Sequence, residues 1–93
     1  MTGKPWFVYL LLCGDGTLYC GIALDVQARL ETHRAGKGAK YTRGRSPLEL
    51  VFIEPWGSKG EALARERAIK AMPRAKKVAL VLIPSCLQKN GTR

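Results

Sequence analysis

The sequence predicts a small α+β domain in which a three-stranded sheet is packed by helices, in the order β-β-α-β-α-α. Two runs rich in aromatic and aliphatic residues, 6–13 and 17–22, flank a Gly-Asp-Gly turn, which is typical of a hairpin. A third run, 48–53, is almost continuously apolar. One segment with helix-capping residues lies between the second and third runs, and another follows the third run. Together these patterns favour one sheet with helices packed on it.

The loop of the hairpin determines which residues of the first two strands face each other. If the loop is residues 14–16, Leu11 faces Tyr19 and Tyr9 faces Gly21. The two tyrosines then share one face of the sheet as diagonal neighbours, so their hydroxyls can converge. A glycine opposite Tyr9 also predicts room for the backbone of a ligand to approach.

The first helix is predicted between a capping aspartate and a terminating glycine. Asp25 is a good N-cap and Gly36 a good stop, with apolar residues at helical spacing between them. Arg29 and His33 lie four residues apart on a face that adjoins this apolar stripe. The basic, glycine-rich segment 36–45 is predicted to be a loop.

The second half of the chain predicts one more strand and two more helices. The apolar character of 48–53 indicates a strand in the centre of the sheet. The segment 58–61 is a capping box that opens a helix through Ala71. Pro73 breaks that helix and suits the first turn of another, which is expected to run to about Ile83.

Length and composition predict a single domain over residues 1–93, with a core over about 5–83 and a loose tail at 84–93. Sixteen Lys+Arg against seven Asp+Glu give a net charge of +9, which favours a polyanionic partner. Charge alone does not separate an enzyme from a nucleic-acid binder. No apolar run approaches the roughly 18–20 residues of a membrane span, and no signal-peptide pattern is present. Three cysteines without CxxC spacing indicate reduced thiols, and hence a cytoplasmic protein.

Two aromatic triplets carry a resemblance to the GIY-YIG nuclease superfamily. Phe7-Val8-Tyr9 stands where the first triplet belongs and Tyr19-Cys20-Gly21 where the second belongs, each with one substituted position. More narrowly, the chain is similar to the small stand-alone bacterial proteins of this fold, the YhbQ-like (UPF0213-type) group, from Phe7 to about Leu82. Further matches are residues 25–33, 36–45 and 61–70.

The resemblance implies a metal-dependent endonuclease that hydrolyses phosphodiester bonds in DNA with low sequence specificity, in DNA repair or processing. Arg29 would hold the phosphate through its planar donors, and His33 would contact phosphate or polarise a neighbour, unless it only packs. Tyr9 would orient the attacking water or act as its base, although a free tyrosine has a pKa of about 10. Tyr19 would bind phosphate or Tyr9. The implied catalytic residues are Tyr9, Tyr19, Arg29, His33, Tyr41 and Glu66.

Glu66 is the expected metal ligand. It lies at helical spacing from Ala62 and Ile69, toward the apolar side of its helix, where a carboxylate must be paired or coordinate a cation. A hard Mg²⁺ or Mn²⁺ held by one carboxylate, water and substrate phosphate fits this position. The alternative is an ion pair with Arg65, Arg67 or an arginine elsewhere in the chain.

Basic side chains outside the triplets are expected to track the nucleic-acid backbone. DNA is the more strongly favoured partner, and a monomer or homodimer is expected, with no membrane association. A second hypothesis is a catalytically weak or inactive nucleic-acid-binding module. It is favoured by Ile22, which stands where some repair nucleases of the superfamily carry a lysine. The expected nucleic-acid-binding residues are Lys37, Lys40, Arg43, Arg45, Arg74, Lys76 and Lys77.

Overall fold

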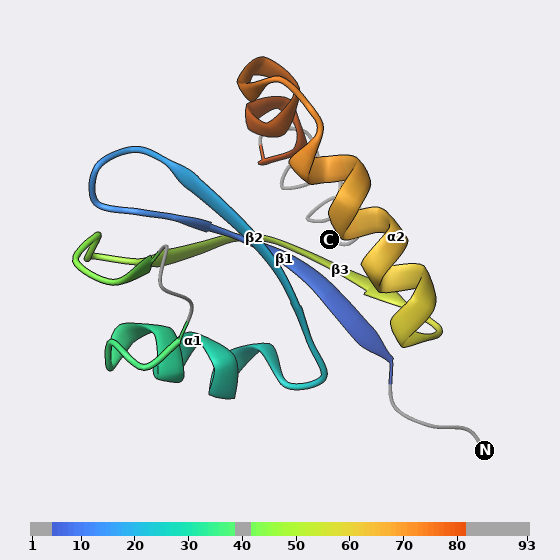
Figure 1. Ribbon diagram of the computed structural model, residues 1–93, viewed down its shortest axis with the longest axis horizontal. Helices are drawn as coiled ribbons and strands as arrows, with labels where there is room; N and C mark the ends of the chain where they lie inside the picture. The colour runs from blue at the N-terminus through green and yellow to red at the C-terminus, as the bar shows by residue number, and fades with distance from the viewer. Residues whose placement is uncertain (1–4, 39–41, 82–93) are drawn as a thin grey trace, which may run out of the picture.

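The computed structural model describes residues 5–38 and 42–81, and it confirms the predicted α+β architecture (Figure 1). Residues 74–81 form a last helical segment after α2. The predicted end of this helix at Ile83 and the predicted tail at 84–93 lie outside the described residues. The labelled elements are β1 (Trp6–Leu12), β2 (Leu18–Ala23), α1 (Val26–Arg34), β3 (Glu49–Trp56) and α2 (Lys59–Lys70).

The hairpin of β1 and β2 has the predicted register. Leu11 faces Tyr19 and Tyr9 faces Gly21 in an antiparallel pairing. The turn is closed by Asp15, whose carboxylate accepts hydrogen bonds from the backbone N–H of Thr17 at 3.1 Å and from its hydroxyl at 2.6 Å. An aspartate that bonds the residue two positions on is a common way to stabilise a tight turn.

The prediction that 48–53 is the central strand is wrong, because the sheet has the order β2-β1-β3. β1 pairs with both neighbours, and its Val8, Leu10 and Leu11 are fully buried. β3 is an edge strand with an exposed Ile53. The apolar run in β3 reflects coverage of the sheet on both faces, which places apolar residues on both sides of a strand whether it is central or not.

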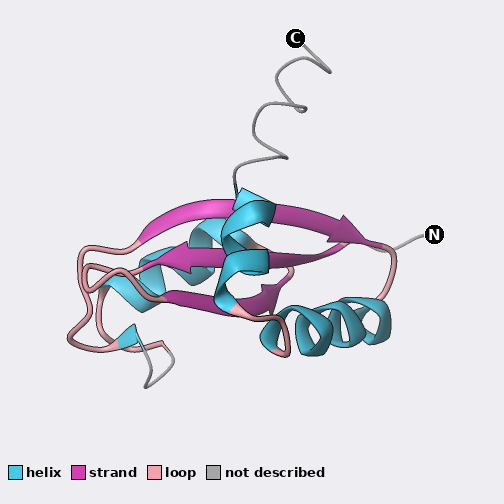
Figure 2. Ribbon diagram, turned by 90° about the horizontal axis from the view of Figure 1, so that it is seen from above, coloured by secondary structure: helices cyan, strands magenta, loops and turns pink. Residues whose placement is uncertain are grey.

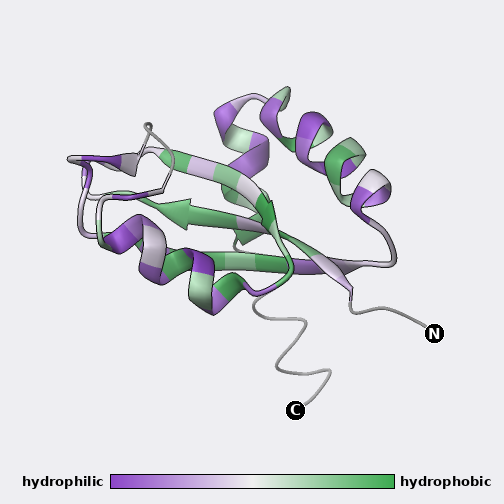
Figure 3. Cartoon of the chain, turned by 60° about the horizontal axis from the view of Figure 1, so that its bottom comes forward, coloured by the Kyte–Doolittle hydropathy of each residue, from purple (hydrophilic) through white to green (hydrophobic). Residues whose placement is uncertain are grey.

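Helices cover both faces of the sheet (Figure 2). α1 lies on one face, where Val26 and Leu30 pack in the same cluster as Tyr9. α2 and the segment 74–81 lie on the other face, where Ala62 and Ile69 pack in a second cluster that includes residues of all three strands. Figure 3 shows the strands as largely apolar and the outer faces of the helices as hydrophilic.

The helix ends follow the predicted capping signals. The Asp25 carboxylate accepts a hydrogen bond from the Ala28 N–H at 3.0 Å, and Gly36 follows α1 with a φ of 78°. Ser58 accepts from the Glu61 N–H at 3.2 Å at the start of α2. Among residues 5–38 and 42–81, no helix combines the length and apolar character required to cross a bilayer.

Candidate nucleic-acid and metal site

Tyr9, Tyr19 and His33 form a cluster on the α1 face of the sheet. The ring centroids of Tyr9 and Tyr19 lie 6.4 Å apart, and that of His33 lies 6.1 Å from Tyr9 and 5.3 Å from Tyr19. The two tyrosine rings therefore share one face of the sheet, as the hairpin register predicts. His33 reaches them because it lies on the buried side of α1, at the spacing of Val26 and Leu30.

Gly21 provides space for Tyr9 itself rather than for a ligand's backbone, contrary to the expectation from the sequence. A Cβ atom at position 21 would lie 2.6 Å from the Tyr9 hydroxyl oxygen and 3.1 Å from a ring carbon of Tyr19. The register places this glycine directly opposite Tyr9, so the phenol ring folds over the strand where no side chain opposes it. Gly21 thus positions the Tyr9 hydroxyl.

Hydrogen bonds hold both ring nitrogens of His33. The Tyr9 hydroxyl lies 3.0 Å from Nε2, and the Thr42 hydroxyl lies 3.1 Å from Nδ1. The residue is only 2% exposed, and a Cβ atom at Gly38 would overlap the imidazole ring. His33 therefore meets Tyr9 and Thr42 rather than solvent, and a direct contact with phosphate would require it to move.

Burial shifts the pKa values of this cluster. Desolvation, aided by Tyr19, raises the pKa of Tyr9 to about 12, while a hydrogen bond and the charge of Arg29 act in the opposite direction. Desolvation and then the charge of Arg29 lower the pKa of His33. At neutral pH, Tyr9 is consequently a phenol and His33 a neutral imidazole, which donates through one nitrogen and accepts through the other.

The lowered pKa of His33 predicts that the protein loses stability as the pH falls. Because the folded state binds this proton less readily than the unfolded chain, protonation of the unfolded chain below its pKa of about 6.5 favours unfolding. We expect a lower melting temperature at about pH 5 than at about pH 8. His33→Gln should flatten this dependence, and an equal dependence in wild type and variant would contradict the assignment.

Glu66 lies on the inner side of α2, where the sequence placed it. Its side chain is 16% exposed, and its carboxylate lies 3.3 Å from the Lys70 ammonium in an i,i+4 pair. Among the described residues, the partner of Glu66 is thus Lys70 rather than one of the arginines considered from the sequence. Arg65 pairs instead with Glu54 on β3 at 2.9 Å.

Glu66 and Lys70 approach the tyrosine cluster around the open edge of β2. Both contribute to the electrostatic environment of Tyr19 and of Cys20, although α2 and the tyrosine rings lie on opposite faces of the sheet. Burial and, next, the charge of Glu66 raise the pKa of the Cys20 thiol to about 11. Because β2 is an edge strand, groups from α1 and α2 can meet beside it.

The chemistry of Glu66 fits a divalent cation. One hard carboxylate oxygen donor is compatible with Mg²⁺, which keeps several waters and takes its other ligands from substrate phosphate. The described residues contain no group of three His, Cys, Asp or Glu side chains that could enclose a metal. A cation held by Glu66 would therefore depend on water and substrate for most of its ligands, and it would compete with Lys70.

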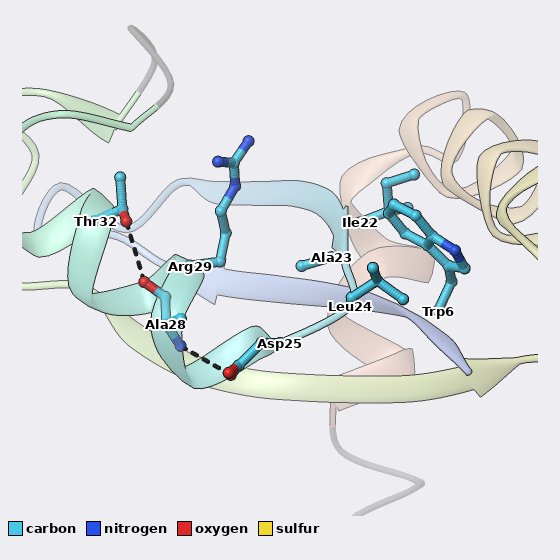
Figure 4. A pocket seen from close by; sticks show the side chains of 8 residues that line it. All are labelled: Trp6, Ile22, Ala23, Leu24, Asp25, Ala28, Arg29 and Thr32. Carbon is cyan, nitrogen blue, oxygen red and sulfur yellow. Dashed lines mark hydrogen bonds between the residues drawn. The ribbon is translucent and has the colours of Figure 1, made fainter. Parts of the chain in front are cut away.

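Two pockets lie along the same edge of β2. One, of about 340 Å³, is lined by Leu10, Leu18, Tyr19, Cys20, Lys70 and Lys77. The other, of about 380 Å³, lies between the end of β2 and α1 and is lined by Trp6, Ile22, Ala23, Leu24, Asp25, Ala28, Arg29 and Thr32 (Figure 4). Tyr19 lines the first pocket, and Arg29, which hydrogen-bonds Tyr9, lines the second.

Only some of the expected nucleic-acid-binding residues lie near this edge. Lys77 lines the first pocket, and Arg74 donates a hydrogen bond to the carbonyl of Gly16 in the hairpin turn at 2.8 Å. Arg45 pairs with Asp15 and thereby ties the loop to the same turn. Lys40 and Tyr41 lie outside the described residues. The exposed members of the set are Lys37, Arg43, Arg74 and Lys76.

Three residues of the site were not identified from the sequence. Lys70 pairs with Glu66, Thr42 bonds His33, and Gly38 makes room for the His33 ring. The i,i+4 spacing of Glu66 and Lys70 was a signal that could have indicated the pair. The contacts of Thr42 and Gly38 depend on how the loop returns to α1, which no local pattern encodes.

Comparison with known proteins identifies relatives across most of the chain. A UPF0213 protein of Natronomonas pharaonis is 53% identical over 75 residues, covering 81% of this chain and 88% of the relative. A UPF0213 protein of Staphylococcus aureus strain Mu3 is 52% identical over 75 residues, covering 81% and 92%.

Two solved structures, both from solution NMR, resemble this one. A UPF0213 protein of Bacillus halodurans is 47% identical with a TM-score of 0.54, covering 83% of this chain and 82% of that chain. A protein of E. faecalis is 36% identical with a TM-score of 0.57, covering 82% and 81%. The family profile described as the GIY-YIG catalytic domain matches residues 5–78. Because this match spans most of the chain, the chain belongs to the GIY-YIG family.

Proposed function

We propose that this protein is a metal-dependent endonuclease that hydrolyses phosphodiester bonds in DNA with low sequence specificity. The observation that carries the proposal is that Tyr9 and Tyr19 lie together beside Arg29, while the charge of Glu66, from α2 on the other face of the sheet, reaches Tyr19. A substrate strand can reach an open strand edge. The net charge of +9 favours a polyanionic substrate.

Arg29 is proposed to bind the scissile phosphate. Arg29 is exposed at the rim of a pocket and close enough to Tyr9 to lower the pKa of that residue by hydrogen bonding and charge. A planar guanidinium can donate two parallel hydrogen bonds to phosphate oxygens. Tyr9 is itself only 1% exposed, so side chains over the cluster would have to move before the phosphorus could lie beside the Tyr9 hydroxyl.

Tyr9 is proposed to orient the attacking water and to pass its proton to His33. In the tautomer with Nδ1–H donating to Thr42, the Nε2 of His33 accepts the Tyr9 hydroxyl hydrogen, which leaves the phenol oxygen able to accept from water. As the water oxygen bonds to phosphorus, its proton moves to Tyr9 and the Tyr9 proton moves to Nε2. The phosphorus–oxygen bond to the leaving group breaks, and that oxygen takes a proton from solvent.

This relay removes the need for a tyrosinate. A pKa of about 12 makes Tyr9 a poor base at neutral pH when it acts alone, whereas a neutral imidazole is a competent proton acceptor there. Glu66 is proposed to hold Mg²⁺ or Mn²⁺ on the other side of the strand edge. When bound, such an ion supplies positive charge that stabilises the developing charge on the phosphate and leaving oxygens.

A second candidate function is a nucleic-acid-binding module without catalysis. It is favoured by the ion pair between Glu66 and Lys70, since a carboxylate engaged by an ammonium is less available to a metal. In that case the same basic residues would grip phosphate and no bond would be cut.

We further propose a cytoplasmic protein that acts in DNA repair or processing. The buried, unpaired thiols of Cys13 and Cys20 support a reducing compartment. The protein would act as a monomer or homodimer and would not associate with a membrane.

The test is cleavage of supercoiled plasmid and of labelled single- and double-stranded DNA and RNA oligonucleotides. We expect cutting of DNA with Mg²⁺ or Mn²⁺ and none with a chelator. Salt-sensitive binding without cutting under every metal condition would instead support the binding module. A preference for RNA would change the substrate class but keep the nuclease assignment.

A further inference from the structure

We propose that the pocket between β2 and α1 is a subsite for one unpaired nucleobase next to the phosphate bound by Arg29, so that the preferred substrate contains a single-stranded or frayed segment. This inference rests on the proposed function, because it places the base relative to the same phosphate. The pocket has a volume of about 380 Å³ and includes Arg29 in its wall. It is linked to the tyrosine cluster through Arg29, whose guanidinium hydrogen-bonds Tyr9.

The wall opposite Arg29 is aromatic and aliphatic. It is formed by Trp6, Ile22 and Leu24 (Figure 4). Leu24 is 47% exposed, the most exposed large apolar side chain among the described residues. The Lys59 ammonium lies over the Trp6 ring, 5.3 Å from its centroid, which places a cation on one face of the indole. Flat, apolar surface beside positive charge is the combination on which proteins bind bases of single strands.

The polar groups of the pocket explain why a base, and not a small polar ligand, fits it. The Asp25 carboxylate already accepts a hydrogen bond from the Ala28 N–H at 3.0 Å, and the Thr32 hydroxyl donates one to the Ala28 carbonyl at 3.1 Å. Figure 4 shows Arg29 extending away from the helix backbone. The pocket thus offers Arg29 for a phosphate and few groups for reading the edge of a base, which predicts weak sequence preference.

The opposite end of the strand edge has different chemistry. The pocket that includes Tyr19 carries Lys70 and Lys77, which suit the phosphates of a backbone. A strand crossing the site would have backbone contacts at this end and one base contact at the Trp6 end. A base in a duplex is covered by its partner and its neighbours, so entry to the Trp6 end requires an unpaired nucleotide.

The test uses Trp6 as the reporter in Trp56→Phe protein, where it is the only tryptophan. Binding is followed with a chelator present, by anisotropy of labelled DNA and by tryptophan emission. The probes are a short single strand, the same strand with one abasic position in each possible place, and a blunt duplex. We expect the intact single strand to quench the Trp6 emission, and the duplex to quench it little at saturation. We expect one of the abasic strands to bind about 5- to 150-fold more weakly than the intact strand.

Leu24→Ala and Ile53→Ala form a matched pair of variants. Both residues are exposed, at 47% and 37%, and only Leu24 lines the pocket. We expect Leu24→Ala to reduce the difference in affinity between the intact and the abasic strand, and Ile53→Ala to leave that difference unchanged. Circular dichroism verifies that both variants are folded.

The outcomes separate this proposal from the nuclease proposal. Unchanged Trp6 emission at saturation, or equal affinity for intact and abasic strands, overturns the base subsite even if DNA is cut in the presence of metal. Quenching that depends on the base supports the subsite even if no cutting occurs under any condition. Equal quenching by the duplex overturns the requirement for an unpaired nucleotide.

Discussion

Replacing Glu66 by glutamine is expected to lower metal-dependent DNA cleavage by about 100- to 1000-fold, the scale on which one charge-stabilising group contributes to catalysis. Glutamine keeps the size and most of the packing of the side chain but presents a neutral amide oxygen, a much weaker ligand for a hard cation. Initial rates of plasmid nicking, measured over a range of Mg²⁺ and Mn²⁺ concentrations, provide the measurement. DNA binding in a chelator should be preserved.

The effect should be on catalysis and not on folding. Loss of the i,i+4 pair with Lys70, whose own side chain is 54% exposed, is expected to cost about 0.3–0.5 kcal/mol, the value typical of such helix pairs. Glu61→Gln is the matched control, since Glu61 lies on α2 but is exposed in its first turn. Cleavage by Glu66→Gln at the rate of Glu61→Gln would show that this carboxylate holds no catalytic metal.

Replacing Tyr9 by phenylalanine is expected to lower the cleavage rate by about 100- to 10,000-fold, the range for loss of a positioned proton-transfer group. The ring would still pack against Tyr19 and beside Gly21, and only the hydroxyl would be lost. The buried Nε2 of His33 would lose its 3.0 Å partner, so a stability loss of about 1–3 kcal/mol is expected as well. Single-turnover cleavage and urea unfolding measure the two effects separately.

Thr42→Val is the control for the structural part of this effect. It removes the partner on the other nitrogen of His33, 3.1 Å from the Thr42 hydroxyl, at a residue that is 2% exposed. A similar loss of stability is expected with a much smaller loss of cleavage, because Thr42 only positions the imidazole. Equal loss of cleavage in both variants would mean that Tyr9 acts through the fold alone.

Sequence patterns determined the elements and much of the site because those features are local. The loop of three residues between β1 and β2 set the register, and the period of two then placed Tyr9 and Tyr19 on one face. Asp25 and Ser58 indicated the helix starts because a capping side chain acts on the N–H groups that follow it. Helical spacing likewise placed Glu66 on the inner side of α2.

Tertiary structure decided the properties that depend on contacts between distant segments. The strand order placed β1 in the centre, since pairing depends on which strand meets both others and not on the apolar content of one strand. The Tyr9 ring occupies the space beside Gly21, and Glu66 forms its ion pair with Lys70. Desolvation raised the pKa of Tyr9 to about 12, a shift that requires the packed cluster. The sequence by itself thus determined which groups exist and which face each occupies, whereas only packing across the edge of β2 decided which of them meet.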